Sequence, residues 1–276
     1  MKVLFIAGTG RSGTTLVDIL LDTHSQVTAL GATPLMPRQF KREDGCACGA
    51  PTLSQCPLWS RVDAVLRERH GRSLASLDLE ARDFDVFSED NRIFFEAAAE
   101  AGGTPYVTDA YKSPRRLWRL LSVPGIEVVP IHVLRDARGY AYSQRKRKRH
   151  LLRTAFTYTY RSILFYAILR RREHLVLEYE QLARDPEGVL SQVMAYLGLA
   201  LEPAQLRWAE YPHHNKEAKG LLKKTAGSAI RPDTGWRQSM PIRTQRLINA
   251  VAWAGNRLNR LKERRWGLAR AGAASG

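Results

Sequence analysis

The feature that most constrains the fold is a strand, turn and helix pattern at the start of the chain. Val3 to Ala7 form a short apolar run with the length and composition of a buried strand. A glycine-rich turn follows, and Leu16, Ile19 and Leu20 then recur at helical spacing. A buried strand that leads through a tight turn into an amphipathic helix is typical of α/β proteins.

The rest of the chain repeats this alternation. Strand patterns end at Asp109, cover Val128 to Leu134 and recur in HLVLEYEQL, while helical patterns follow Pro114, begin at Gly139 and run from Pro186 to Gly198. Residues 31–60 are predicted to be a long loop, and residues 60–102 a polar helical stretch. We therefore expect a P-loop-like parallel sheet flanked by helices. The predicted organisation is a single domain over residues 1–240, with a loop insertion at about 31–60, followed by a basic helix and disordered tail at 241–276.

The turn after the first strand has the properties of a phosphate-binding loop. It keeps both glycines of the pattern G-x-x-x-x-G-K-[ST], but Thr14 replaces the lysine that would reach the phosphates of ATP. Free amides at a helix N-terminus still attract an anion, and hydroxyl side chains add donors. Arg11 stands at the tip, where it could hold a group in transfer. The predicted anion-binding residues are Gly10, Arg11, Ser12, Gly13, Thr14 and Thr15.

A second phosphate site is predicted in the stretch VLRDARGYAYSQRKR. Arg135 ends a strand, and Ser143 lies two helical turns further on, so both side chains can face one dianionic phosphate. Arg147 lies one turn beyond Ser143 on the same face. The neighbouring Lys146, Lys148 and Arg149 fit a solvated basic run equally well.

These stretches resemble motifs of one enzyme family. RSGTTL resembles the 5′-phosphosulfate loop of sulfotransferases that use 3′-phosphoadenosine 5′-phosphosulfate (PAPS), and its arginine is similar to that of tyrosylprotein sulfotransferases and many bacterial relatives. VLRDARGYAYSQRKR resembles the 3′-phosphate motif of that family. The resemblance runs from Val3 to about Trp236. It further implies Tyr179 in LVLEYEQLARDP as a cofactor contact, Lys112 in DAYKSP near the sulfuryl group, and Arg231 in AIRPDTGW closing over the nucleotide.

The resemblance implies in-line transfer of SO3 from PAPS to an acceptor hydroxyl or amine, which leaves 3′-phosphoadenosine 5′-phosphate (PAP). Arg11 and Lys112 would stabilise charge on the departing nucleotide without a metal ion. The acceptor stays open as a small molecule, carbohydrate, lipid or peptide, because family members vary the loops that shape the second pocket.

The general base is the gap in the resemblance. Relatives carry a Gly-Glu pair after the first helix, but here Gly31 is followed by Ala32, which cannot accept a proton. Asp109, Glu43 or Asp44 could replace the glutamate. Alternatively, the acceptor needs little help from a base, or nucleotide binding is poorly coupled to chemistry.

Charge leaves two other functions to weigh. Lys and Arg number 43 against 27 Asp and Glu, which gives a net charge of +16 and a pI near 10.2, so polyanions, acidic lipids or anionic cofactors would be attracted. A P-loop kinase-like NTP-dependent transferase is disfavoured by Thr14 and by the lack of an obvious acidic residue for magnesium. A nucleic-acid-binding protein is disfavoured because the charge is split among several segments that match no standard recognition motif.

Three cysteines and the chain ends bear on location. Cys46, Cys48 and Cys56 are an odd number in one segment, which favours ordinary thiols in a reducing cytosol; zinc would need a fourth ligand from elsewhere. We find no pattern of a signal peptide or membrane span and expect a cytoplasmic protein.

The C-terminal helix has an apolar stripe between arginines, which favours a docked surface helix over one lying on the inner face of an anionic membrane. The stripe comprises Leu247, Val251, Leu258 and Leu261.

Overall fold

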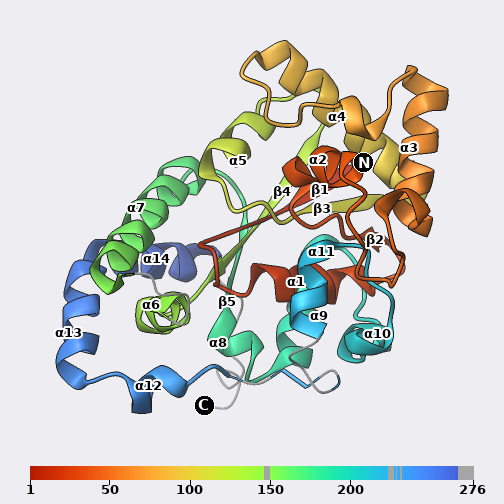
Figure 1. The fold of residues 1–276 in the computed structure, drawn as a ribbon. Coiled ribbons are helices and arrows are strands. Elements are labelled where there is room, and N and C mark those ends of the chain that lie inside the picture. The colour runs from red at the N-terminus through yellow and green to blue at the C-terminus, as the bar shows by residue number, and fades with distance from the viewer. Residues whose placement is uncertain (146–149, 223–226, 228, 231, 267–276) are drawn as a thin grey trace. The chain divides into compact units, whose positions relative to one another are not determined.

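Five strands form one sheet in the order β2-β3-β1-β4-β5 in a computed structural model (Figure 1). The structure describes residues 1–145, 150–222, 227, 229–230 and 232–266. Parallel pairing joins β1 to β3, β2 to β3 and β4 to β5. The strands are β1 (Lys2–Gly8), β2 (Val27–Thr28), β3 (Tyr106–Asp109), β4 (Glu127–Leu134) and β5 (Leu175–Glu178).

Helices flank this sheet, as the alternating pattern predicts. They are α1 (Thr14–Asp22), α2 (Met36–Lys41), α3 (Pro57–His70), α4 (Phe84–Gly102), α5 (Pro114–Leu120), α6 (Ala137–Arg145), α7 (Leu151–Leu169), α8 (Tyr179–Leu182), α9 (Pro186–Leu197), α10 (Pro203–Leu206), α11 (Lys216–Leu222), α12 (Gly235–Ser239), α13 (Ile242–Val251) and α14 (Trp253–Trp266). The α/β class is therefore confirmed. No helix in the described part of the chain is both long and apolar enough to cross a membrane.

The predicted elements are mostly present, with local differences. Val3 to Ala7 are fully buried in β1, and Pro186 and Gly198 bound α9 as expected. The segment 31–60 is not a plain loop, because it contains α2, two 3₁₀ turns and the start of α3. The helical stretch at 60–102 is two helices, since Gly71 ends α3 with a φ of 63°.

Two further boundaries differ from the prediction. The strand in HLVLEYEQL ends at Glu178, and Tyr179 opens the short helix α8. The C-terminal helix is two helices, α13 and α14, which are separated at Ala252. The side chains that pack inward there include Ile248 and Asn259. Of the predicted stripe, Leu247 and Leu261 are exposed, whereas Val251 packs against the buried cluster that contains Ile248.

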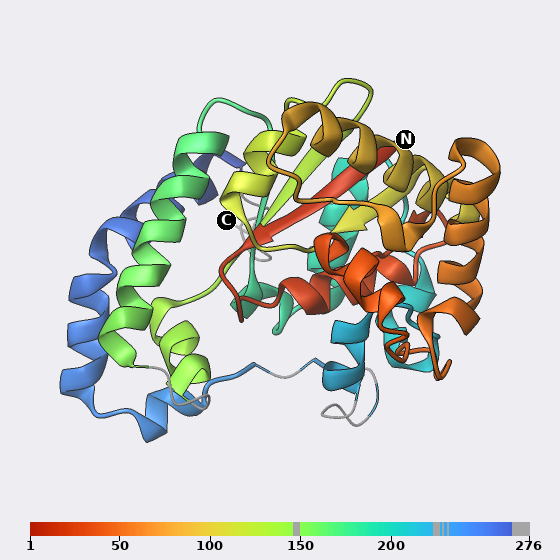
Figure 2. The ribbon, with the colours of Figure 1, turned by 45° about the horizontal axis from the view of Figure 1, so that its top comes forward.

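The residue contacts divide the chain into two compact units, each built from separate segments. The first comprises Met1–Ile6, Thr15–Val129 and Glu202–Ala229; within it α3 packs on α4, and Trp59 stacks on Phe94 with ring centroids 6.4 Å apart. The second comprises Ala7–Thr14, Pro130–Leu201 and Ile230–Gly276. Within this second unit α7 packs against α6, α13 and α14, and Figure 2 shows α13 and α14 beside α7.

Candidate active site

The loop between β1 and α1 is a tight turn that places Arg11 at its tip. The backbone N–H of Ser12 donates to the carbonyl of Thr9 over 3.0 Å, and the Ser12 hydroxyl donates to the same oxygen over 2.7 Å. Arg11 has a φ of 79°, a left-handed conformation that costs a non-glycine residue roughly 1–2 kcal/mol. Strained residues of this kind gather at ligand-binding sites, so the conformation of Arg11 marks the loop as a candidate site.

Glycine is required in the loop where Tyr179 packs against it. Gly13 has a φ of 96°, and a Cβ at this position would lie only 2.6 Å from Cδ2 of the Tyr179 ring. By contrast, a Cβ on Gly10 would meet no atom within 4 Å, so space is open beside the backbone at that point. The Tyr179 ring therefore covers the loop at Gly13, while the backbone at Gly10 stays accessible to a ligand, as a phosphate-binding turn requires.

The two predicted phosphate motifs meet at Arg11, Arg135 and Ser143. Nη1 of Arg135 donates to the backbone carbonyl of Arg11 over 2.6 Å, and Nε of Arg11 donates to Oγ of Ser143 over 3.0 Å. The guanidinium of Arg11 thus lies beside the residue expected at the 3′-phosphate. Two cationic side chains and a hydroxyl converge here from segments more than a hundred residues apart in the sequence.

Arg135 is buried and has donor capacity left over. Its side chain is 6% exposed, and Nη2 pairs with Asp233 over 2.8 Å. Its Nε is also buried, but no hydrogen-bond acceptor among the described residues reaches it. A buried donor without an acceptor costs roughly 1–3 kcal/mol, which an anionic ligand would recover. The orphaned donor fits a phosphate oxygen.

Neighbouring groups hold Arg135 in place. Its guanidinium carbon lies 4.6 Å from the centre of the Tyr179 ring, and the Tyr158 hydroxyl donates to its carbonyl over 3.1 Å. A Cβ on Gly139 of α6 would approach Nε of Arg135 to 3.3 Å, so the helix passes close to this side chain. Burial raises the pKa of Tyr179, which therefore stays a neutral phenol beside the cation.

The geometry agrees with what the family comparison finds. The sulfotransferase family model matches residues 4–203, which is most of the chain. The chain belongs to the sulfotransferase family. The matched region contains the loop around Arg11, the strand end at Arg135 and the helix that carries Ser143.

Solved structures share the fold of this sulfotransferase. The sulfotransferase domain from the Synechococcus PCC 7002 olefin synthase aligns with a TM-score of 0.61 at 15% identity, covering 95% of this chain and 94% of that one. The sulfotransferase domain from the curacin biosynthetic pathway aligns with a TM-score of 0.58 at 16% identity, covering 90% of this chain and 96% of that one. None of the curated proteins compared with this chain matches its sequence.

Among the candidate bases, Asp109 is engaged in a structural ion pair. It is fully buried in the first unit, and one of its oxygens accepts from Nε of Arg116 over 2.6 Å and from the Thr33 hydroxyl over 2.8 Å. Breaking a buried pair of this kind is costly. This pairing stabilises the fold of the first unit, and a role for Asp109 as the base stays a prediction.

The other two predicted carboxylates lie in the surface segment after α2. Asp44 accepts from Nζ of Lys216 over 2.6 Å, and Glu43 is exposed with a φ of 52°. Ala32 is buried and occupies the position expected for the catalytic glutamate. None of these observations supplies a base at the Gly31-Ala32 pair.

Glu217 does reach that pair, and sequence reasoning missed it. A Cβ on Gly31, whose φ is 67°, would lie 3.1 Å from Oε2 of Glu217 and 2.7 Å from the Asn215 side chain. Burial is the main cause that raises the pKa of Asp18; the charge of Lys112 opposes that rise and the charge of Glu217 adds a little to it, so both groups act on one acid within this unit. No local pattern marks Glu217, because its partner Gly31 is distant in the sequence.

Four other residues are predicted to bind the nucleotide, namely Thr14, Thr15, Arg147 and Arg231. Thr14 and Thr15 open α1, which places their backbone N–H groups in its unpaired first turn. Arg147 and Arg231 lie outside the described residues.

A cavity of about 530 Å³ within the second unit has Arg135 in its lining. Four further arginines line it, Arg138, Arg184, Arg237 and Arg260, together with the carboxylates of Asp136, Glu178 and Glu180. Burial raises the pKa of Glu180, while a hydrogen bond from the backbone N–H of Asp136 to its carboxylate opposes that rise. The lining therefore mixes five arginines with three acidic side chains, so its charge does not exclude an anionic ligand.

Proposed function

We propose that this sulfotransferase transfers the sulfuryl group of PAPS to an acceptor hydroxyl or amine. PAPS supplies an SO3 group on a phosphate leaving group, so transfer forms a new bond from the acceptor to sulfur and releases PAP. The observation that supports this donor best is the direct hydrogen bond between Arg135 and Arg11, which joins the two motifs expected at opposite ends of the nucleotide.

The residues of the second unit would bind and orient the donor. Backbone N–H groups from Gly10 to Thr14 would donate to the 5′-phosphosulfate, while Arg135 and Ser143 would bind the 3′-phosphate, with the orphaned Nε as a ready donor. Arg11 contacts Ser143 now and would turn toward the charge that develops as the sulfur–oxygen bond breaks. Lys112 would add a second cation at that step. Losing one such donor typically costs about 3 kcal/mol of transition-state stabilisation.

Glu217 would take the acceptor proton. Its carboxylate lies against Gly31, next to the position where relatives carry the glutamate. A side chain from α11 would therefore take the role that this glutamate has in relatives. The role needs only a carboxylate within reach of the acceptor oxygen or nitrogen. We therefore place it ahead of Asp109, Glu43 and Asp44.

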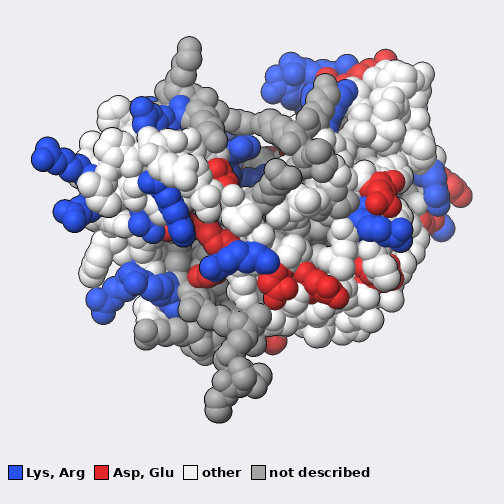
Figure 3. Space-filling model, turned by 90° about the horizontal axis from the view of Figure 1, so that it is seen from below, with Lys and Arg blue, Asp and Glu red and all other residues white. Residues whose placement is uncertain are grey.

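The acceptor class stays open in this proposal as a small molecule, carbohydrate, lipid or peptide. The family match disfavours an NTP-dependent kinase and a nucleic-acid-binding protein. On the face seen in Figure 3, basic and acidic side chains of the described residues are interspersed. We also propose a cytoplasmic location, because none of the three cysteines is joined in a disulfide.

The donor is tested by calorimetry with PAP, PAPS and ATP, without magnesium. We expect PAP and PAPS to bind in the micromolar range or tighter and ATP at least tenfold more weakly. Transfer is then followed with 35S-labelled PAPS and a panel of phenols, amines, sugars and lipids. Tight ATP binding with no affinity for PAP would contradict the proposal.

Peripheral contact with an anionic membrane is a second proposal, which concerns partners. Exposed apolar side chains on α13 and α14 alternate with exposed arginines, and Trp253 is 58% exposed. Truncating these helices would remove Ile248 and Ala252 from a buried cluster, so point variants are the better test. Trp253→Ser with Leu261→Ser should reduce sedimentation with phosphatidylserine vesicles, whereas exposed Phe84→Ser on α4 should not. Equal sedimentation of all forms would exclude the contact.

A further inference from the structure

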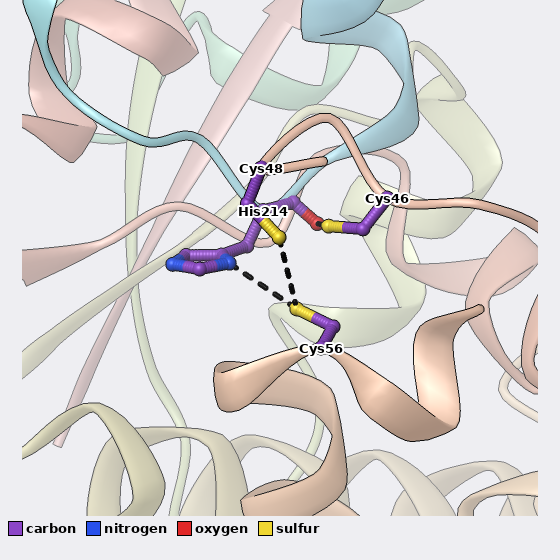
Figure 4. Close-up of side chains that lie close together, drawn as sticks. All are labelled: Cys46, Cys48, Cys56 and His214. Atoms are coloured by element: carbon purple, nitrogen blue, oxygen red, sulfur yellow. Dashed lines mark hydrogen bonds between the residues drawn. The ribbon is translucent and has the colours of Figure 1, made fainter. Parts of the chain in front are cut away.

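Three cysteines and one histidine of the first unit point their ligand atoms at one another (Figure 4). Cys46, Cys48 and Cys56 lie in one short segment, and His214 comes from the segment before α11. Their sulfur and nitrogen atoms all lie within 4.8 Å of one another. The three cysteines are neighbours in the sequence, but His214 is 158 residues from Cys56, and only the fold brings its ring to the cysteines.

The separations within the cluster are within a few tenths of an ångström to about one ångström of those around a tetrahedral metal ion. The sulfurs of Cys48 and Cys56 are 3.8 Å apart, and the sulfur of Cys56 is 3.2 Å from Nδ1 of His214. Bond lengths of about 2.3 Å to sulfur and about 2.0 Å to nitrogen imply ligand separations of about 3.5–3.8 Å around zinc. A disulfide would need sulfurs about 2.05 Å apart, so the cysteines are not paired with one another.

The surroundings of the cluster are those of a built site. Cys46 and Cys56 are almost completely buried, and the indole N–H of Trp59 donates to the carbonyl of His214 over 2.6 Å. The thiol of Cys46 contacts the same carbonyl at 3.4 Å. Both contacts reach the backbone carbonyl of His214 and hold this residue beside the cysteine segment.

We propose that Cys46, Cys48, Cys56 and His214 bind one Zn²⁺ ion through three sulfurs and Nδ1. Four protein ligands complete a tetrahedral shell and leave no open position for a substrate, which is the pattern of a structural site. Three thiols would release their protons when the ion binds. Its four ligands belong to the first unit, whereas Arg11, Arg135 and Ser143, which we assign to the nucleotide, belong to the second.

The ion would fix the segment that carries the proposed base. On either side of His214, His213 pairs with Asp22 at 2.7 Å and Asn215 donates to Asp18 over 2.9 Å. Glu217 follows two residues later, against Gly31. Zinc would add a bond from this segment to the cysteine segment and so hold the start of α11. This consequence for Glu217 rests on the proposed function, whereas zinc binding itself does not.

Metal analysis of the purified full chain tests the site. Protein prepared without added metal or chelator should contain about one zinc ion per chain by mass spectrometry. Mercurial modification of the thiols should release that zinc to a colorimetric chelator. Cys56→Ser and His214→Ala should each lower the zinc content at least tenfold, whereas the control His70→Ala, at the end of α3 in the same unit, should keep it.

A second measurement covers variants that fail to fold. The wild-type chain reconstituted with Co²⁺ should show the intense visible bands of a tetrahedral thiolate site. Zinc below a tenth of an ion per chain together with no cobalt bands, or a Cys48–Cys56 disulfide in the freshly isolated protein, would overturn the proposal. Arg135→Ala should keep its zinc while losing PAP, so failure of the zinc site and failure of the nucleotide site are told apart.

Discussion

Nη1 of Arg135 donates to the backbone carbonyl of Arg11 over 2.6 Å, which joins the end of β4 to the loop after β1. The contact fixes the distance between two motifs that are read separately in the sequence. It also uses only one part of the guanidinium, because Nη2 pairs with Asp233 and Nε has no acceptor among the described residues.

Replacing Arg135 should remove nucleotide binding. Arg135→Ala deletes a buried cation that faces the proposed 3′-phosphate, and losing such a partner typically costs about 2–5 kcal/mol. We expect PAP affinity to fall by about a hundredfold or more in calorimetry. Arg170→Ala, an exposed arginine at the end of α7, is the matched control and should bind PAP normally. Equal affinity in the two variants would contradict the site.

Removing the carboxylate of Asp233 should strengthen nucleotide binding. Asp233 already supplies a negative group to Arg135 at 2.8 Å, so a phosphate must share or displace it. Asp233→Asn keeps the shape and removes the charge, and we expect PAP affinity to rise by about tenfold. Glu187→Gln, an exposed site on α9, changes the net charge equally. If both variants bind PAP with the same gain, the effect is general charge rather than the contact with Arg135.

Glu217→Gln should slow transfer without weakening PAP binding. The amide keeps the packing against Gly31 but cannot accept a proton, and loss of a general base typically lowers kcat by about 10²–10⁴-fold. The rate is measured with the best acceptor from the labelled panel, and PAP affinity by calorimetry. Exposed Glu210→Gln serves as the control in the same unit. A rate equal to that of the control would exclude Glu217 as the base.

Asp18 should make the stability of the folded chain depend on pH. Burial is the main cause that raises its pKa from 3.8 to about 7, opposed by the Thr108 hydrogen bond. The folded state then binds more protons than the unfolded state between these values, so stability falls as pH rises through this window and levels off above it. The loss is about 4 kcal/mol at most. Stability below pH 4 keeps the full contribution.

The comparison for this prediction is Asp18→Asn, which cannot ionise. Urea unfolding from pH 4.5 to 7.5 should show the wild-type chain losing free energy of unfolding relative to this variant as pH rises. The exposed Asp85→Asn should track the wild type over the same range. A constant difference between the wild type and Asp18→Asn would show that Asp18 does not titrate in this window.

The sequence by itself determined the parts of the site that are read from neighbouring residues. The first strand and the turn from Gly8 to Gly13 can be predicted from the local sequence, because a buried strand, a glycine turn and a helix N-terminus each have a recognisable pattern within a few residues. The strand end at Arg135 and the helix position of Ser143 follow in the same way, since helical spacing fixes which side chains share a face. The α/β class and the family resemblance rested on these stretches.

Only the tertiary structure decided which distant residues complete them. Glu217 reaches Gly31, and His214 reaches Cys56, through contacts between segments that share no local pattern. Asp109 was a candidate base in the sequence, but the fold buries it against Arg116. Such pairings depend on how helices and loops pack after the strands align, and that packing is set by the whole core rather than by any one segment.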